Sequence, residues 1–250
     1  VIYSLTLITW NNIWIIISLL VIFLLPLSSY LLVKNVKLDS RENTDEKEFK
    51  DENIKQWRRI EVLKDYRFYI ISLNMLAMPW IATGVFVFQS FIANSKGWGD
   101  YTIPQSFMSY SIFSVLTLII SGFLVDKFTS RKLLIYMNVP LFLSTFVLIY
   151  FDSSYSAFAF LGLIGVSNGL ANLLGSSTWA EIYGVKYIGS IKALTTALMV
   201  FATAFGTALF GFLIDIGFSI ENIATVSSFS IGISIFLLFL IRKKLNPVFI

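Results

Sequence analysis

Seven long segments without a single charged residue divide this chain. They cover residues 1–33, 68–95, 101–125, 133–151, 153–180, 193–214 and 222–241. At a rise of 1.5 Å per residue, each is long enough to cross about 30 Å of hydrocarbon as a helix. The segmentation therefore predicts an all-α, polytopic transmembrane helical bundle with about seven spans.

The basic residues lie in alternate gaps between these segments. All but one of the 19 Lys and Arg residues fall in the first, third and fifth gaps and in the C-terminal tail, and the other three gaps hold only Lys96. Cytoplasmic loops of membrane proteins carry such an excess of positive charge. We therefore expect a multi-pass protein of the cell (plasma or inner) membrane, with its N-terminus outside and its C-terminus in the cytoplasm.

The composition fits a lipid environment. Hydrophobic residues make up 56% of the chain and charged residues 14%, whereas a soluble domain carries about a quarter charged residues. The net charge of +4 does not indicate nucleic-acid binding, because the basic residues serve as topological signals and as contacts for lipid headgroups. The expected partner is the bilayer, and no nucleic acid is expected.

Several kinds of chemistry are excluded by missing residue types. The chain has no Cys and no His, which removes disulfides, thiol chemistry, haem ligation and nearly all zinc sites. No nucleophile–base pair or metal-binding cluster appears at membrane depth. We therefore expect no enzyme activity, no metal and no cofactor, and any proton coupling must use carboxylates.

A highly charged segment, 34–67, separates the first span from the other six. Its first half, 37–51, is polar enough to be disordered. Its second half places Ile54, Trp57, Ile60 and Leu63 at spacings of three, which is typical of a short helix on the membrane surface, although a solvated connector is the alternative. Six spans follow over 68–241, and a basic tail covers 242–250.

One cytoplasmic turn carries a recognisable motif. Residues 122–132 include Gly122, Asp126, Lys127, Arg131 and Lys132. This turn resembles the loop signature of the major facilitator superfamily, which recurs after the second and eighth helices of those transporters. Gly122 is expected to permit a close helix approach, Asp126 to pair with basic groups or a helix N-terminus, and the three basic residues to hold the turn inside. A basic turn with one acid is also common in other membrane proteins.

The motif has one departure from the family pattern. Thr129 stands where the family favours Gly, and this predicts a less tight turn.

Further resemblances follow in the family's order. The stretch around Trp179, Glu181 and Gly184 is similar to the connection between the tenth and eleventh helices, and the pattern from Gly206 to Asp215 resembles the eleventh helix. The charged linker corresponds to the family's central loop. The resemblance implies that 68–241 is the C-terminal six-helix domain, and that 1–33 holds the tail of one helix (1–8) and the last helix of an N-terminal bundle. The chain starts on Val, so we expect a C-terminal portion of a longer carrier or an unusual start codon.

The resemblance places a substrate cavity near mid-membrane, at the interface of two helix bundles. Segments 68–91, 104–125, 155–179 and 188–214 would line it from the C-terminal bundle. The candidate substrate-binding residues are Asn168, Asn172, Trp80 and Ser109. The two Asn are four residues apart and share a helix face; each candidate has a structural alternative, which is an interhelical bond for the amides, packing for Trp80 and a bond to its own helix for Ser109. Small residues on one face of 155–179 (Gly162, Gly165, Gly169, Gly175) indicate close packing against another helix.

These observations predict a secondary active transporter that moves a small solute by alternating access. A missing N-terminal bundle or a second copy must complete its cavity. The Trp179-x-Glu181-x-Tyr183-Gly184 pattern is similar to the oxalate/formate–monocarboxylate branch, but no charged residue lies deep in any span to meet an anion. The alternatives are a non-transporting truncated membrane protein or scaffold, and a seven-helix receptor or sensor. A retinal protein is disfavoured because the last span has no Lys.

Overall fold

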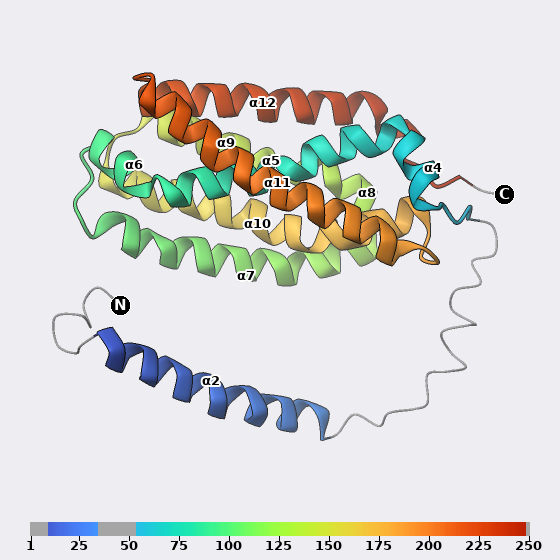
Figure 1. The fold of residues 1–250 in the computed structure, drawn as a ribbon, viewed down its shortest axis with the longest axis horizontal. Helices are drawn as coiled ribbons and strands as arrows, with labels where there is room; N and C mark the ends of the chain where they lie inside the picture. Colours follow the sequence, from blue (N-terminus) through green and yellow to red (C-terminus); the bar gives the residue numbers. More distant parts are fainter. Residues whose placement is uncertain (1–9, 35–53, 249–250) are drawn as a thin grey trace. The chain divides into compact units, whose positions relative to one another are not determined.

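The chain forms two compact units, Val1–Glu52 and Asn53–Ile250, in a computed structural model that describes residues 10–34 and 54–248 (Figure 1). The predicted helix tail at 1–8 and the predicted disordered half of the linker at 37–51 lie outside the described residues. The second unit begins at Asn53, so the last part of the predicted linker belongs to the six-span bundle.

The first unit contains one described helix, α2 (Trp10–Val33). It carries no charged residue along its whole length, which is what a helix that crosses hydrocarbon requires. Pro26 lies inside it and cannot donate a helical hydrogen bond. This helix confirms the first predicted span, within the charge-free segment 1–33.

The second unit is a helical bundle. Its elements are α4 (Arg59–Lys64), α5 (Tyr66–Val87), α6 (Gln89–Ser95), α7 (Thr102–Phe128), α8 (Ser130–Leu133), η2 (Leu134–Tyr136), α9 (Val139–Tyr150), α10 (Ser154–Tyr183), α11 (Ile188–Asp215), α12 (Ile220–Ile241) and η3 (Arg242–Lys244). The span predicted at 133–151 is built from α8, η2 and α9. Together with α2, seven helical stretches of the described residues are long and apolar enough to cross a membrane. The all-α, multi-pass prediction is therefore confirmed.

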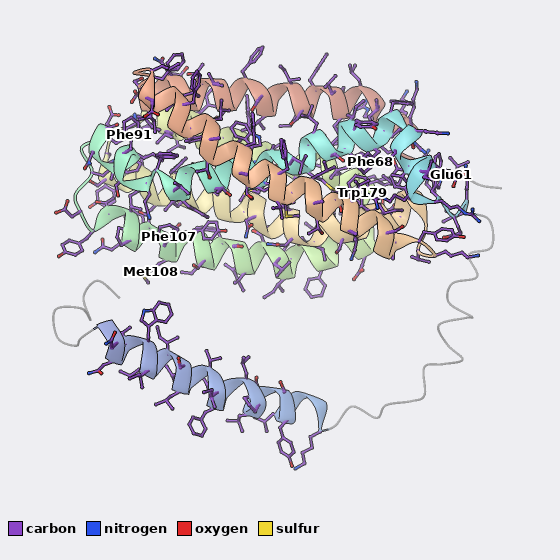
Figure 2. The ribbon with its side chains drawn as sticks, in the orientation of Figure 1. Glu61, Phe68, Phe91, Phe107, Met108 and Trp179 are labelled. Carbon is purple, nitrogen blue, oxygen red and sulfur yellow. The ribbon has the colours of Figure 1, made fainter. Side chains whose placement is uncertain are left out.

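The bundle is built from closely packed helix pairs (Figure 1). α7 lies along α10, α5 lies along α11, and α9 and α12 pack on each other and also contact α10 and α5, respectively. The buried core consists of two clusters. Phe68 and Trp179 lie toward one end of the bundle, whereas Phe91 and Phe107 lie toward the other (Figure 2).

Glycines allow the helices of two pairs, α7 with α10 and α5 with α11, to approach each other closely. Added Cβ atoms on Gly165 and Gly169 of α10 would collide with the α7 backbone at Tyr110 and Ser114, and one on Gly206 of α11 would collide with the carbonyl of Trp80 on α5. The predicted small-residue face of α10 therefore packs against α7. Gly175 does not take part, since a Cβ there would meet no atom within 4 Å.

Lys96 organises one end of the bundle. Its Nζ lies 2.7 Å from Asp152 Oδ1 and 2.8 Å from Glu221 Oε1, and its side chain is only 1% exposed. The Lys96 cluster (Lys96, Asp152 and Glu221) thus joins the segment after α6, the α9–α10 turn and the start of α12. Burial lowers the pKa of Lys96, but the hydrogen bonds and charges of its two carboxylate partners more than reverse this, and the pKa is raised above its ordinary value.

At the opposite end, which we call the basic end, lie the turn 129–132, the connection 184–187 and η3. The second half of the linker docks here, where Trp57 N donates to Tyr183 O at 3.0 Å. The predicted helix over 54–63 is shorter than expected and covers only α4. Residues 55–58 are not helical. Within α4, Val62 is buried and Ile60 is 69% exposed.

Candidate functional site

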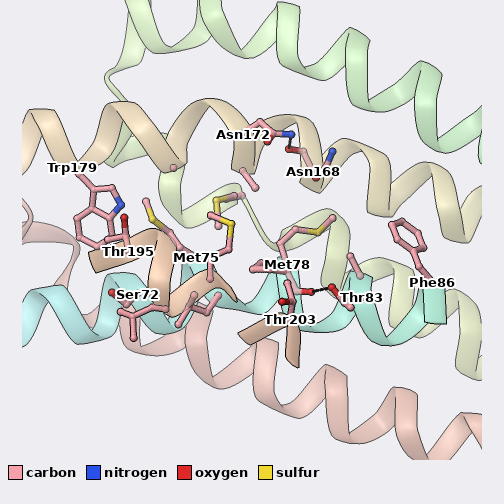
Figure 3. A pocket seen from close by; sticks show the side chains of 18 of the residues that line it. Ser72, Met75, Met78, Thr83, Phe86, Asn168, Asn172, Trp179, Thr195 and Thr203 are labelled. Atoms are coloured by element: carbon pink, nitrogen blue, oxygen red, sulfur yellow. Dashed lines mark hydrogen bonds between the residues drawn. The ribbon is translucent and has the colours of Figure 1, made fainter. Parts of the chain in front are cut away.

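A cavity of about 270 Å³ lies between helices of the bundle (Figure 3) and is open to the bundle surface, where its lining residues Asn172 and Met199 are exposed. Most of its lining residues belong to α5, α7, α10 and α11, the four helices that the sequence analysis singled out, and Met137 between η2 and α9 completes the lining. The lining residues are Ser72, Met75, Leu76, Met78, Pro79, Ala82, Thr83, Phe86, Tyr110, Met137, Asn168, Ala171, Asn172, Gly175, Trp179, Thr195, Leu198, Met199 and Thr203. No charged residue is among them.

Methionine dominates the cavity chemically. The protein has five Met residues, and four of them, Met75, Met78, Met137 and Met199, line the cavity. Methionine side chains are flexible and polarisable, and they adapt to ligands of different shapes. The wall therefore suits an apolar or weakly polar molecule.

Aromatic residues lie at both ends of the cavity. Figure 3 shows Trp179 at one end and Phe86 at the other. Trp179 stacks on Tyr183, with ring centroids 5.9 Å apart, while Phe86 meets Tyr110 edge to face at 5.3 Å. Both ends of the cavity are therefore lined by aromatic surface.

The two predicted asparagines supply the amide groups of the cavity. Asn168 Nδ2 donates to Ser114 Oγ on α7 at 2.9 Å, and Asn172 Nδ2 donates to the Asn168 carbonyl one turn earlier at 3.0 Å. Their side-chain carbonyl oxygens accept no hydrogen bond from the described residues. Asn168 therefore joins two helices and, like Asn172, keeps an acceptor for a ligand hydroxyl or amide.

Some of the hydroxyl groups that line the cavity already donate hydrogen bonds within the protein, and others do not. Thr83 donates to Pro79 O at 2.7 Å and Thr203 to Val200 O at 2.7 Å, both within their own helices. Ser72 Oγ is buried and has no partner among the described residues. Ser72 is consequently the lining hydroxyl with the most to gain from a ligand.

The other two predicted substrate residues do not line the cavity. Trp80 is 9% exposed and packs between α5 and α11, with its ring centroid 6.1 Å from that of Phe205 and 6.3 Å from that of Phe210. Ser109 donates to the Phe158 carbonyl of α10 at 2.9 Å. In this structure both residues hold helix pairs together.

In the motif turn, Thr129 adopts a backbone conformation that is typical of glycine. Thr129 ends α7 with φ 70° and ψ 146°, and among the described residues no other non-glycine has a positive φ. Gly184 ends α10 in nearly the same conformation, with φ 82° and ψ 168°. The expectation of a less tight turn is therefore corrected: the turn retains the tight shape and places a β-branched residue in a strained conformation.

Glu181 connects α10 to this turn. Its carboxylate accepts hydrogen bonds from Ser130 Oγ and from Arg131 N, and its Oε1 lies 2.5 Å from Arg131 Nε. Two residues of the predicted loop motif, Glu181 and Arg131, are thus brought together and fix the α7–α8 turn against the end of α10.

The remaining motif residues make no such contacts. Asp126, Lys127 and Lys132 are exposed and form no ion pair within the described part of the chain. A Cβ on Gly122 would meet no atom within 4 Å, so the close approach expected at Gly122 is not made inside this bundle. These positions lie on a surface that another bundle or the lipid headgroups can reach.

Sequence reasoning did not identify the methionines or Ser72 as cavity residues. A signal was present, because Met75 and Met78 are three residues apart and immediately precede Pro79. Pro79 cannot donate the helical hydrogen bond that the Met75 carbonyl would otherwise receive. α5 is continuous through Pro79 and lacks this one hydrogen bond beside the cavity-lining methionines.

Searches against family models, curated proteins and solved structures returned no match for this chain.

Proposed function

We propose that this chain is part of a secondary transporter that moves a small, uncharged and largely apolar solute. The observation that carries the proposal is the uncharged, methionine-lined cavity between α5, α7, α10 and α11. The buried Ser72 hydroxyl and the two asparagine carbonyls give the solute a few polar contacts. An anionic solute is disfavoured because no lining cation compensates for its desolvation.

Completion of the cavity by a second helical bundle is the second part of the proposal. In the most apolar 18-residue stretch of each helix, only 6% of the residues of α7 and 22% of those of α11 are buried, against 50% for α5. Side chains such as Met199 and Phe201 of α11 are 48% and 71% exposed. A preceding N-terminal bundle or a second copy would cover this surface and create the two-sided cavity that alternating access needs.

The orientation follows from the charges. We place the basic end of the bundle in the cytoplasm, together with the C-terminus, because it carries the excess of Lys and Arg. The chain has no Cys, so single cysteines can test this directly. A membrane-impermeant maleimide added to whole cells should label Asp100→Cys and not Lys192→Cys; the reverse pattern would refute the orientation.

A matched pair of probes tests the substrate class. N-phenyl-1-naphthylamine is uncharged, and 8-anilino-1-naphthalenesulfonate has a closely related ring system with an added negative charge. We expect the protein in proteoliposomes to bind and move the uncharged probe in preference to the sulfonate, measured by probe fluorescence against protein-free vesicles.

The methionines provide the matched variants. Met199→Trp adds bulk at the cavity wall, whereas Met108→Trp makes the same change at the one Met outside the lining, which is 67% exposed. We expect Met199→Trp to weaken binding of the uncharged probe about tenfold, from a steric cost of 1–2 kcal/mol, and Met108→Trp to leave it unchanged. Equal effects of the two variants, or a preference for the sulfonate, would contradict the proposal.

A further inference from the structure

A second pocket, distinct from the cavity, opens at the basic end of the bundle. It measures about 400 Å³ and lies between the α8–η2 segment and η3. Four cationic residues line it, Arg131, Lys132, Arg242 and Lys243, together with Tyr136 and Asn246. No acidic residue is among the lining residues, and none of these residues belongs to the cavity.

The charges of this pocket are only partly compensated. Glu181 pairs with Arg131, and Arg131 Nη1 also donates to Asn246 Oδ1 at 2.9 Å, so this side chain is held in place. Lys132, Arg242 and Lys243 form no ion pair with the described residues. The Arg242 guanidinium lies 3.9 Å from the centroid of the Phe239 ring, which positions it without neutralising it. Three uncompensated cations around one hollow attract an anion.

An apolar groove opens between the two helices that adjoin the segments of this pocket in the sequence. It measures about 530 Å³, lies between α9 and α12, and is lined by residues that include Phe142, Phe146, Gly232 and Phe236. η2 precedes α9 and η3 follows α12, so the pocket and the groove lie at successive depths along these helices. Phe236 is six residues before Arg242, which corresponds to about 9 Å along a helix.

We propose that this pocket and groove together bind one anionic phospholipid. The phosphate of the headgroup lies among Lys132, Arg242 and Lys243, and an acyl chain runs along the α9–α12 groove. Basic residues at the end of transmembrane helices hold anionic headgroups in this manner. A free phosphate shares the headgroup chemistry, but only a lipid uses both the charged pocket and the apolar groove, whose nearest lining residue on α12 is Phe236.

Native mass spectrometry of the purified, delipidated chain tests this site. The chain is mixed with phosphatidylglycerol or phosphatidylcholine of identical acyl chains, and retained lipid is counted. We expect preferential retention of phosphatidylglycerol. The double variant Arg242→Gln/Lys243→Gln should weaken it about thirty-fold, from the loss of two charges near the membrane surface. The control Lys186→Gln/Lys192→Gln removes two basic residues elsewhere at the same end and should change it less than about threefold.

Two further measurements separate the lipid from free phosphate. Gly232→Leu fills the groove, because a Cβ there already approaches Phe142 to 3.5 Å, and it should reduce phosphatidylglycerol retention with the charges intact. Inorganic phosphate at millimolar concentration should not displace the lipid. Displacement by phosphate together with no effect of Gly232→Leu overturns the lipid assignment, and equal retention of the two lipids, or equal loss in both double variants, overturns the site. Circular dichroism of each variant confirms that it is folded.

Discussion

Replacing Thr129 by glycine should stabilise the protein. Thr129 holds φ 70° and ψ 146° at the end of α7, a region that is essentially reserved for glycine and costs other residues about 1–3 kcal/mol. Its Oγ1 is also buried without a partner among the described residues, and leaving such a group unpaired costs about 1–3 kcal/mol. Both costs disappear in Thr129→Gly.

The gain is reduced by the greater freedom of glycine in the unfolded chain, which costs about 1 kcal/mol. We therefore expect a net stabilisation of at least about 1 kcal/mol, which corresponds to an increase in Tm of at least about 2–4 °C for a domain of this size. Thermal unfolding in detergent, followed by tryptophan fluorescence, measures it, since Trp57 and Trp179 lie at the same end of the bundle.

Two control variants separate the backbone from the hydroxyl. Thr129→Ala removes the hydroxyl but keeps a Cβ, so it should recover only part of the gain. Gly184→Ala introduces a Cβ at nearly the same backbone conformation (φ 82°) and should destabilise the protein. If Thr129→Gly is no more stable than Thr129→Ala, the strain argument is wrong.

Three further predictions concern buried groups elsewhere. Gly206→Ala should lower stability by about 1–3 kcal/mol, because its Cβ would collide with the Trp80 carbonyl; Gly189→Ala, where a Cβ meets nothing within 4 Å, is the control in the same thermal assay. Asn74 is fully buried and both amide atoms lack partners among the described residues, so Asn74→Leu should raise Tm by an amount equivalent to about 1–3 kcal/mol; an unchanged or lower Tm would show that the amide is paired. The raised pKa of Lys96 means that its contribution to stability is complete below about pH 10.4 and is lost as the pH rises through the folded-state value; Lys96→Met should remove this alkaline loss, and its persistence in the variant would assign it to another group.

The seven apolar spans could be predicted because charge burial is expensive. A charged side chain in the hydrocarbon core costs several kcal/mol, so charges mark the ends of spans regardless of how the helices pack. The breaks within spans were not predictable in this way. α5 ends at Phe88 and α9 begins after Asn138, and both breaks lie inside apolar segments whose hydropathy does not change there.

The cavity residues were predicted only in part because their identity depends on helix rotation. Asn168 and Asn172 stand out in the sequence because an amide in an apolar span needs a partner. Trp80 directly follows Pro79, yet successive residues point about 100° apart around a helix. Pro79 consequently lines the cavity while Trp80 packs on α11. No single-sequence pattern fixes that rotation.

The packing also indicates where movement can occur if the cavity opens alternately as proposed. The glycine contacts of Gly165 and Gly169 lock α10 to α7, and that of Gly206 locks α11 to α5. Neither pair can deform without backbone collisions, since packed interiors do not yield gradually. The cavity lies between these two pairs, where its adaptable methionines replace close backbone contact. Access should therefore change by movement of one pair, or of the whole bundle, as a rigid body, and the methionines allow the wall to repack around the solute during that movement.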